Sequence, residues 1–452
     1  MTPKSPEEVV EEAKRSGIKY VRYLIIDIHG VPKGVTMPST SLESAFENGI
    51  GFDGSSIPGY VATEFSDLVA VPDPNTFFRI PGEDVAMLIC DVRHPGGKVF
   101  EGGCRQILKS VCEGLREMGI GVWAGFELEY FYVKLRQVGL EAMDRGMYFD
   151  LSPLDVGEEL RLRTIEVLRE RGIEITRTHH EVAPGQHEIG IVRSEPVEMA
   201  DKMVYAKLTT KVLARRSGYT ATFMPKPFPG VNGSGCHVHV SFYDLKTGRN
   251  LFFDEGGEYG LSEVGRWFIG GLMRFAPSLS LVVAPTVNSY KRLVPHHEAP
   301  VYVCWGFANR TVLIRVPTYY PGVEGLTRVE YRHPDPSLNP YLGLAAIIQA
   351  GLYGIEHKVD PGEPCYRNVF KLSEAELREL GLELLPEHLR EAVEKFENDS
   401  EARGFLGEHV SNALCELKGR EFEEYMAYVG KPWRETVETV TRWEIERYLE
   451  RV

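Results

Sequence analysis

The sequence predicts an α+β protein with two domains, and three observations support this prediction. The chain has 452 residues, which is more than one hydrophobic core usually supports. Residues 1–103 combine one capped helix with short β-branched runs that end in glycine- and proline-rich turns. Beyond residue 103, longer helical patterns alternate with strand-like runs. We therefore expect an N-terminal domain at residues 1–103 and a larger domain at residues 104–452.

The N-terminal domain begins with a predicted helix. Ser5 can cap this helix, Pro6 suits its first position, and Glu8 completes a capping box. Residues between the later turns are rich in valine, isoleucine and tyrosine, which is typical of strands. Strands are expected at residues 20–28, after the turn at residues 30–34, and at residues 85–92.

The larger domain is expected to mix strands with helices. A rigid, glycine-punctuated loop at residues 224–235 leads into a strand that carries two histidines. The chain from Ser373 onwards is predicted to be helical, because Ser373 and Glu376 form a second capping box. Further helices are expected from Gln106 onwards and over residues 158–171 and 204–216.

Composition excludes several classes of protein. The chain is 43% apolar and 26% charged, and its net charge of −14 argues against nucleic-acid binding. Seven scattered cysteines without a CxxC pair indicate buried thiols in a reducing compartment. No signal peptide is recognisable, and the longest apolar run, residues 341–355, is too short to span a membrane. We therefore expect a cytoplasmic protein without a membrane or nucleic-acid partner.

Two short segments place possible metal ligands two residues apart. Glu127 and Glu129 form one pair, and His237 and His239 form the other. On a strand this spacing puts both side chains of a pair on the same face. Aromatic residues surround the glutamate pair, and burying unpaired carboxylates costs several kcal/mol. A bound cation would resolve this conflict.

Neither pair is decisive alone, because a solvated strand face explains most Glu-x-Glu pairs and a His-x-His pair can lie in a core. Together with further carboxylates at Glu181, Glu188 and Glu330, they predict a site for divalent cations. Oxygen ligands with one imidazole suit Mg²⁺ or Mn²⁺ better than zinc. Arginines can clamp phosphate or carboxylate groups. Five of them follow nearby: Arg292, Arg310, Arg315, Arg328 and Arg332. These residues predict an enzyme that uses ATP or phosphate, with the acceptor left open.

The ordered motifs of the chain resemble those of glutamine synthetase, type I. The matching segments are residues 52–57, 125–130, 180–188, 224–227, 232–239, 288–295, 309–310 and 339–342. The resemblance covers nearly the whole chain. It implies a β-grasp N-terminal domain and a catalytic domain with a curved antiparallel sheet, similar to that of ATP-guanido phosphotransferases, with helices outside and a C-terminal helical segment. It also implies a homododecamer of two stacked hexameric rings.

The resemblance also implies a role for each site residue. One metal would be held by Glu129, Glu181 and Glu188, and a second by Glu127, His237 and Glu330. Glutamate would contact Asn232, Gly233, Arg292, Glu298 and Arg332. Ammonium would lie among Asp53, Ser56, Tyr148, Glu181 and Glu298. ATP and its phosphates would contact His239, Ser241, Arg310, Arg315 and Arg328. The catalytic residues would be Asp53, Glu298 and Arg310.

The activity implied by the resemblance is the ATP-dependent formation of glutamine, a step of nitrogen metabolism. The γ-carboxylate of glutamate would take a phosphoryl group from ATP, and ammonium would then displace phosphate from γ-glutamyl phosphate. Two or more Mg²⁺ or Mn²⁺ ions would serve each site. Asp53 would accept a proton from ammonium in the active site of a neighbouring subunit, while the flap around Glu298 would exclude water.

The chain departs from the family pattern at four places. Phe370 stands where some members carry an adenylylated tyrosine, so the chain resembles the non-adenylylated, alpha-like form. Ala62 stands where certain members have an arginine used in feedback inhibition. The pair at residues 296–297 and the long segment at residues 316–329 leave the amine substrate open. A ligase for larger amines such as polyamines is therefore one rival interpretation, and a non-catalytic protein of the same fold is another.

Overall fold

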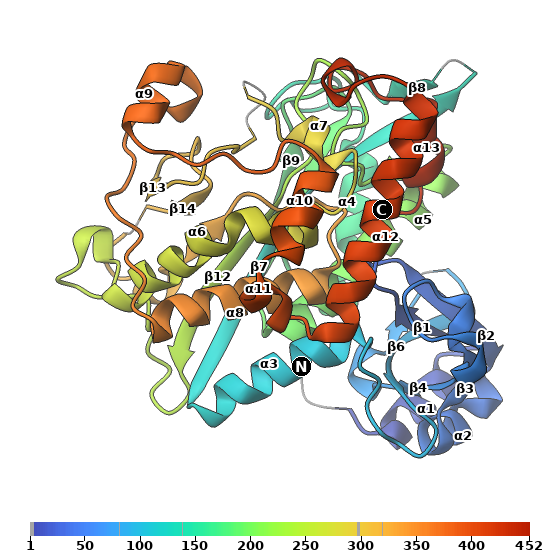
Figure 1. The fold of residues 1–452 in the computed structure, drawn as a ribbon. Coiled ribbons are helices and arrows are strands. Elements are labelled where there is room, and N and C mark those ends of the chain that lie inside the picture. Colours follow the sequence, from blue (N-terminus) through green and yellow to red (C-terminus); the bar gives the residue numbers. More distant parts are fainter. Residues whose placement is uncertain (1–3, 81, 138, 296–298, 319) are drawn as a thin grey trace.

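A computed structural model describes residues 4–80, 82–137, 139–295, 299–318 and 320–452. The described chain contains two separate β-sheets (Figure 1). The first sheet uses strands up to Arg93, and the second begins at Ile120. The helix between them starts at Cys104, so the predicted domain boundary near residue 103 falls between the two sheets and stays a prediction.

The N-terminal sheet has six strands in the order β2-β1-β6-β4-β3, with β5 paired to β6. Its central strands β1 and β6 run parallel, and the other neighbours are antiparallel. The helices of this domain are α1 (Pro6–Arg15) and α2 (Leu42–Asn48). The strands are β1 (Tyr20–Ile26), β2 (Pro32–Pro38), β3 (Ile50–Asp53), β4 (Asp67–Pro72), β5 (Phe78–Arg79) and β6 (Val85–Arg93). This arrangement agrees with the predicted β-grasp domain.

The second sheet has nine strands in the order β13-β14-β15-β12-β7-β10-β9, with β8 and β11 paired to β7. Its pairs are antiparallel except β13–β14, which is parallel, so the predicted antiparallel sheet needs this one correction. The strands are β7 (Ile120–Arg136), β8 (Gly139–Ala142), β9 (Ile175–His180), β10 (Gln186–Ile191), β11 (Thr220–Thr222), β12 (Cys236–Asp244), β13 (Trp305–Phe307), β14 (Ile314–Val316) and β15 (Val329–Tyr331).

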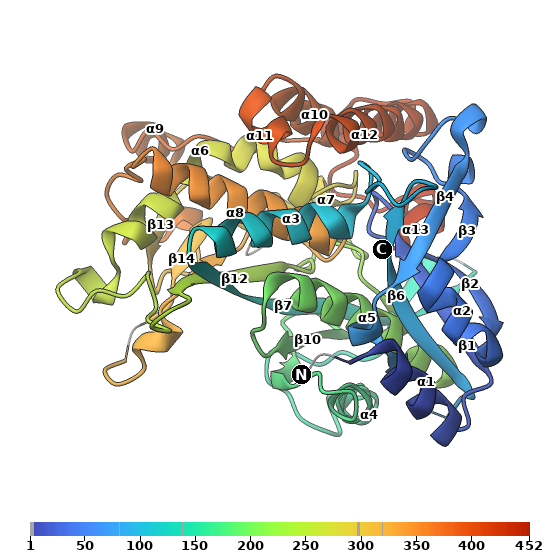
Figure 2. The same ribbon diagram turned by 90° about the horizontal axis from the view of Figure 1, so that it is seen from below.

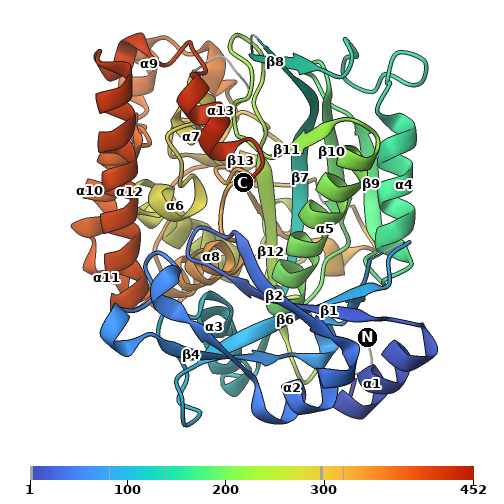
Figure 3. The same cartoon turned by 90° about the vertical axis from the view of Figure 1, so that its right-hand side faces the viewer.

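Helices cover the second sheet. Figure 2 shows α3 (Cys104–Glu117), α6 (Glu263–Val283) and α8 (Pro340–Glu356) stacked over β7 and β12. The remaining helices are α4 (Glu158–Arg169), α5 (Pro196–Arg216), α7 (Ser289–Arg292), α9 (Glu374–Glu379), α10 (Leu389–Glu397), α11 (Ser400–Gly404), α12 (Glu408–Val429) and α13 (Arg442–Tyr448). Figure 3 shows the N-terminal sheet lying across one end of β7 and β12.

One buried arginine ties the two sheets together. Arg105 on α3 donates hydrogen bonds to Asp73 and Asp91 of the N-terminal domain and to Asp201 on α5. The three ion pairs measure 2.8 Å each. Three carboxylates around one guanidinium compensate its buried charge, because a guanidinium has five donors in a fixed fork. This contact is one of several that join the N-terminal domain to the larger one.

The predicted helices are present, with shifted ends. The capping boxes at Ser5 and Ser373 both form. Helix α3 starts two residues before Gln106, and α4 ends at Arg169 instead of residue 171. Helix α5 starts at Pro196, well before the predicted residue 204, because proline is favoured in the first turn and Met199, Ala200 and Met203 are buried there.

The long apolar run forms the core helix α8, whose side chains are largely buried. Within the described ranges, no helix combines the length and the apolar character that crossing a membrane requires. All seven cysteines are free thiols. Five of them are buried, as expected, whereas Cys365 and Cys415 are only partly covered.

Candidate active site

The register of four neighbouring strands brings the predicted metal ligands together. His237 on β12 lies opposite Glu127 on β7. Glu188 on β10 lies opposite Glu129, two residues further along β7. Glu330 on β15 lies opposite His239 on the other edge of β12. Because alternate residues share a face of a sheet, both pairs found in the sequence point to the same side.

The first group of ligands surrounds His237. Its Nδ1 lies 3.3 Å from Glu127 Oε2 and 3.8 Å from Glu330 Oε1. His239 Nε2 lies 3.2 Å from Glu127 Oε1. Among the described residues, Glu127, His239 and Glu330 form one group whose ligand atoms all lie within 4.8 Å of one another. Both imidazoles therefore stand within reach of the same two carboxylates.

The charges of this first group suit a cation. Burial and the neighbouring Arg332 lower the pKa of His237, which leaves the imidazole neutral, the form that binds metal. Burial alone would raise the pKa of Glu127, but contacts with His237 and His239 bring it far below its usual range. Burial alone would raise the pKa of Glu330, but the positive charge of Arg332 outweighs it and brings the pKa below its usual range. Both carboxylates are therefore ionised at neutral pH.

The second group consists of carboxylates that repel one another. Burial, followed by the negative charges of Glu181 and Glu188, raises the pKa of Glu129 well above its usual range. His179 lies 3.4 Å from Glu181 and 3.3 Å from Glu188. The Gly235 N–H donates to Glu129 at 2.7 Å. A divalent cation fits this group, because it would relieve the repulsion that raises the pKa of Glu129.

A cavity of about 520 Å³ joins the two groups, a size that suits a small substrate. Its walls include most residues predicted for metal, glutamate and ammonium. They are Glu127, Glu129, Tyr148, Glu181, Glu188, Asn232, Gly233, His237, Arg292, Arg310 and Arg332. The larger cavity of about 780 Å³ lies between α3, α5 and the N-terminal sheet. We place the chemistry in the smaller cavity, because the larger one contains none of the predicted ligands.

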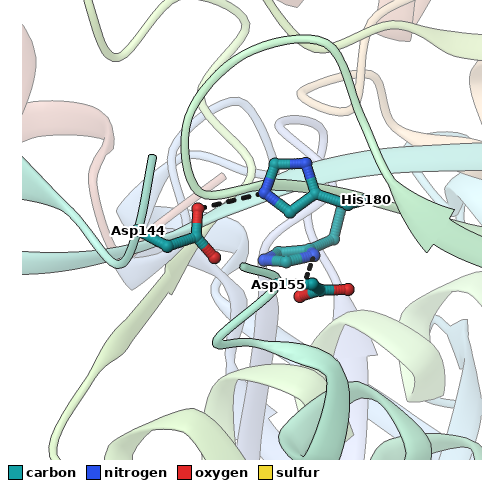
Figure 4. Close-up of side chains that lie close together, drawn as sticks. Asp144, Asp155 and His180 are labelled. Atoms are coloured by element: carbon teal, nitrogen blue, oxygen red, sulfur yellow. Dashed lines mark hydrogen bonds and ion pairs between the residues drawn. The ribbon is translucent and has the colours of Figure 1, made fainter. Parts of the chain in front are cut away.

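A buried network beside the site holds the turn that carries two ligands (Figure 4). His180 Nε2 lies 3.0 Å from Asp144, whose carboxylate also accepts the Gly185 N–H at 2.8 Å. The Arg161 guanidinium lies 2.8 Å from Asp155 and 2.9 Å from His187 Nδ1. This guanidinium already supplies a positive charge to the cluster. We therefore interpret the cluster as a support for the segment between Glu181 and Glu188, and not as a third metal site.

Two family models match the chain along most of its length. "Glutamine synthetase, beta-Grasp domain" matches residues 17–95, and "Glutamine synthetase, catalytic domain" matches residues 101–448. The chain belongs to the glutamine synthetase family. The predicted family and fold class are thereby confirmed, and so is the prediction that the chain is an enzyme.

Several relatives of this glutamine synthetase family member are similar along their whole length. The glutamine synthetase of Pyrococcus horikoshii is 42% identical over 440 residues, which cover 97% of both chains. That of Thermotoga maritima is 42% identical over 458 residues, covering 99% of this chain and 100% of the relative. A solved structure entitled "GmaS/ADP complex-Conformation 1" is 30% identical, with a TM-score of 0.86, and the match covers 97% of this chain and 98% of that one.

Four of the residues predicted to bind glutamate line the cavity: Asn232, Gly233, Arg292 and Arg332. The Arg292 guanidinium donates to the backbone carbonyl of His333 at 2.9 Å. Gly233 must be a glycine, because a Cβ there would come within 2.2 Å of the Pro225 carbonyl oxygen. Glu298 lies outside the described residues, so its predicted contacts with glutamate and ammonium stay predictions.

Two of the residues predicted to bind ATP contact members of the first ligand group. Arg315 donates to Glu330 at 2.5 Å, and Arg328 donates to His239 Nδ1 at 3.1 Å. Ser241 is buried two residues further along β12, and no described wall of the cavity includes it. Arg310 is exposed at the cavity. The structure thus brings Arg310, Arg315 and Arg328 near the ligands and leaves Ser241 further away.

Two predicted ammonium residues do not reach the cavity of their own chain. Asp53 ends β3, and its carboxylate accepts hydrogen bonds from Ser55 and Ser56. These hydrogen bonds lower the pKa of Asp53. The described residues that line the cavity all come from Glu127 onwards, so the N-terminal domain of the same chain contributes none of them. Tyr148, in contrast, lines the cavity and stacks on Phe149 with ring centroids 4.1 Å apart.

Sequence reasoning missed two cavity residues on β9, Arg177 and His179. Together with Glu181 they stand at every second position, the same alternation that revealed the Glu and His pairs. Extending that alternation backwards from Glu181 would have found them. Phe370, which was noted only in connection with adenylylation, also lines the cavity.

Proposed function

We propose that this chain joins ammonium to the γ-carboxylate of L-glutamate, forming L-glutamine, ADP and phosphate by way of γ-glutamyl phosphate. ATP-dependent glutamine synthesis is the activity predicted from the sequence, and membership of the family confirms it. The observation that supports the detailed reaction is the strand register. It brings together four carboxylates and two imidazoles, namely Glu127, Glu129, Glu188, Glu330, His237 and His239. Glu181 joins Glu127, Glu129, Glu188 and His237 on the walls of one cavity, which arginines also line.

Two divalent cations, Mg²⁺ or Mn²⁺, are proposed for this site. Glu129, Glu181 and Glu188 would hold one, and Glu127, His237 and Glu330 would hold the other. The raised pKa of Glu129 and the neutral imidazole of His237 support this assignment. When bound, such cations neutralise phosphate charge and polarise the phosphoryl oxygens.

The side chains around these ligands would bind the substrates. Asn232, Gly233, Arg292 and Arg332 would hold glutamate, because two guanidinium groups and a close backbone match its carboxylates. Arg310, Arg315 and Arg328, with His239 and Ser241, would bind the phosphates of ATP. Arg310 would stabilise the charge of the transferring phosphoryl group, since it is exposed at the cavity and can reach a bound substrate.

The second half of the reaction needs a base and a dry pocket. Asp53 would remove a proton from ammonium before the amine attacks the acyl phosphate. Its hydrogen bonds with Ser55 and Ser56 keep it ionised, as a base must be. Ser56, Tyr148, Glu181 and Glu298 would complete the ammonium pocket, and Glu298 would close the flap that excludes water.

The position of Asp53 supports a shared active site. Because this carboxylate does not reach its own cavity, the base would come from a neighbouring subunit. We propose a homo-oligomer, a dodecamer of two hexameric rings, in the cytoplasm. We further propose the type I, non-adenylylated, alpha-like form, because Phe370 offers no hydroxyl for modification, and a domain boundary near residue 103.

A test of the proposed function measures ADP release by the purified protein with glutamate and ATP. Ammonium should support the fastest reaction, and product analysis should identify glutamine. The comparison panel is methylamine, ethylamine and putrescine at equal free-base concentration, with a reaction lacking glutamate as the blank. A higher kcat/KM with putrescine would assign the chain to the rival amine ligases. No glutamate-dependent ADP release would favour a non-catalytic protein.

A further inference from the structure

Arg177 forms a contact that the predicted reaction does not use. Its Nη2 donates to Glu127 Oε1 at 2.5 Å, and its Nε donates to Glu188 Oε1 at 3.3 Å. Glu127 and Glu188 belong to the two different ligand groups. The side chain of Arg177 keeps 49% of its surface exposed and lines the cavity. One guanidinium therefore contacts a carboxylate of each ligand group.

Arg177 also shares its surroundings with the predicted phosphate residues. Burial lowers the pKa of Arg328, and the nearby cations Arg315 and Arg177 lower it further, against the opposing effect of Glu330 and Glu127. Arg315 on β14 donates to Glu330, and Arg328 just before β15 donates to His239, whereas Arg177 on β9 donates to Glu127. The three guanidinium groups thus lie around the first ligand group, with Arg177 on β9 and Arg315 on β14, on opposite sides of β7 and β12 in the sheet.

We propose that Arg177 binds the polyphosphate of the nucleotide, an addition that rests on the proposed function. Glu127 and Glu188 cannot serve both the guanidinium and divalent cations with the same oxygen atoms. If these oxygens held cations, they would no longer accept hydrogen bonds from Arg177, and its guanidinium would be free to turn to another partner. A second positive group beside two cations is stable only next to an anion, and the nucleotide polyphosphate is the anion that the reaction brings.

The chemistry of arginine fits this role. A guanidinium can donate two parallel hydrogen bonds to one phosphate group, and such charge-assisted bonds are stronger than neutral ones. Half of the side chain is exposed, so its loss removes little packing, although its partners Glu127 and Glu188 keep only 16% and 5% of their side-chain surface exposed. Arg177→Gln therefore removes the charge while it leaves β9 and its pairing to β10 in place.

The test measures nucleotide binding by titration calorimetry in Mg²⁺, with no turnover. In Arg177→Gln, the Kd for ADP should rise about 10- to 100-fold, the range that one charge-assisted hydrogen bond gives. The Kd for adenosine, which has no phosphate, should not change. Arg177→Lys keeps the positive charge but lacks the forked donors of a guanidinium. Its Kd for ADP should therefore lie between those of the wild type and of Arg177→Gln. Arg169→Gln, an exposed arginine on α4 paired with Glu174, is the matched control and should bind ADP like the wild type.

A second measurement uses Mn²⁺ alone. Arg177→Gln should bind Mn²⁺ more tightly than the wild type, because the competing guanidinium has left Glu127 and Glu188. Weaker Mn²⁺ binding would mean that Arg177 only holds the ligands in place, and it would overturn the proposal. Equal losses for ADP and adenosine, or unchanged ADP binding, would also overturn it. If the wild type itself bound no ADP, the proposed function and this inference would both fail, whereas unchanged binding in the variant alone rejects only the role of Arg177.

Discussion

His237 on β12 lies directly opposite Glu127 on β7, with 3.3 Å between Nδ1 and Oε2. Glu129 lies two residues beyond Glu127 on the same face of β7. Its carboxylate lies 4.0 Å from Nε2 of His237. One imidazole thus stands between the two ligand groups. A change in the register of these strands by a single residue would turn every one of these side chains to the other face.

The first prediction concerns the ligands themselves. Glu129→Ala and Glu330→Ala should each reduce kcat/KM at least about 100-fold, the scale of losing electrostatic stabilisation of a transition state. Steady-state assays with ammonium would measure this. Glu141→Ala, at the exposed position of strand β8, is the control and should keep near-normal activity. Near-normal turnover in either ligand variant would contradict the metal assignment.

A second prediction concerns metal removal. A cation that binds only the folded protein stabilises it by about 2.7 kcal/mol at 100 times its Kd. Addition of Mn²⁺ should therefore raise the Tm of the wild type, and a chelator should reverse the shift. In Glu129→Gln the neutral amide no longer repels Glu181 and Glu188. This variant should have a higher metal-free Tm than the wild type and a smaller shift with Mn²⁺. A full Mn²⁺ shift in Glu129→Gln would argue against its role as a ligand.

A third prediction concerns the contact between the domains. Arg105→Ala leaves Asp201 without its cation, while Asp73 and Asp91 keep only their contacts with Lys109, so the free energy of unfolding should fall by about 3–5 kcal/mol. Denaturant unfolding would measure the change. Arg116→Ala on the same helix breaks only the more exposed pair with Glu195 and should cost less than about 1 kcal/mol. If both variants lost the same free energy of unfolding, the buried contacts of Arg105 would contribute no more stability than the exposed pair.

The sequence could predict which residues form the site, but not how they meet. Alternation along a strand places Glu127 with Glu129, and His237 with His239, because that rule is local. The opposition of Glu188 to Glu129 depends on pairing between strands far apart in the chain. The start of α5 also differs from the prediction because it depends on contacts with the rest of the chain. Packing extends this helix back to Pro196, before the predicted residue 204. Arg177 was missed because it precedes the recognised segment at residues 180–188, although it continues the alternation of Glu181 and His179 backwards along the chain.

The position of Asp53 is a different kind of result. Its motif was recognised in the sequence, yet the structure of one chain leaves it outside the cavity that contains the ligands. No pattern within a chain specifies contacts between chains. The role of Asp53 therefore depends on the proposed assembly and needs its own experiments.

A fourth prediction tests whether subunits share active sites. Asp53→Ala and Glu129→Ala subunits should each be nearly inactive as pure oligomers, because each lacks one essential carboxylate. Dissociated, mixed and reassembled, they should regain part of the activity, since some sites then receive Asp53 from one subunit and Glu129 from another. Mass measurement must verify that the oligomers are mixed. No recovery in verified mixtures, or a fully active monomer, would contradict shared sites.

The last prediction separates the two chemical steps. If Asp53 removes a proton from ammonium, Asp53→Ala should slow glutamine formation by about 10²–10⁴-fold, the usual range for a general base. The first phosphoryl transfer should be affected far less, because Asp53 is no ligand of the proposed cations and lies in another domain. Rapid-quench measurement of acyl phosphate and of glutamine in the same samples would follow both steps. Ser55→Ala removes one hydrogen bond to Asp53 but keeps the carboxylate, so it should cost much less. Equal slowing of both steps in Asp53→Ala would leave the enzyme as proposed and reject the role of Asp53 as the base.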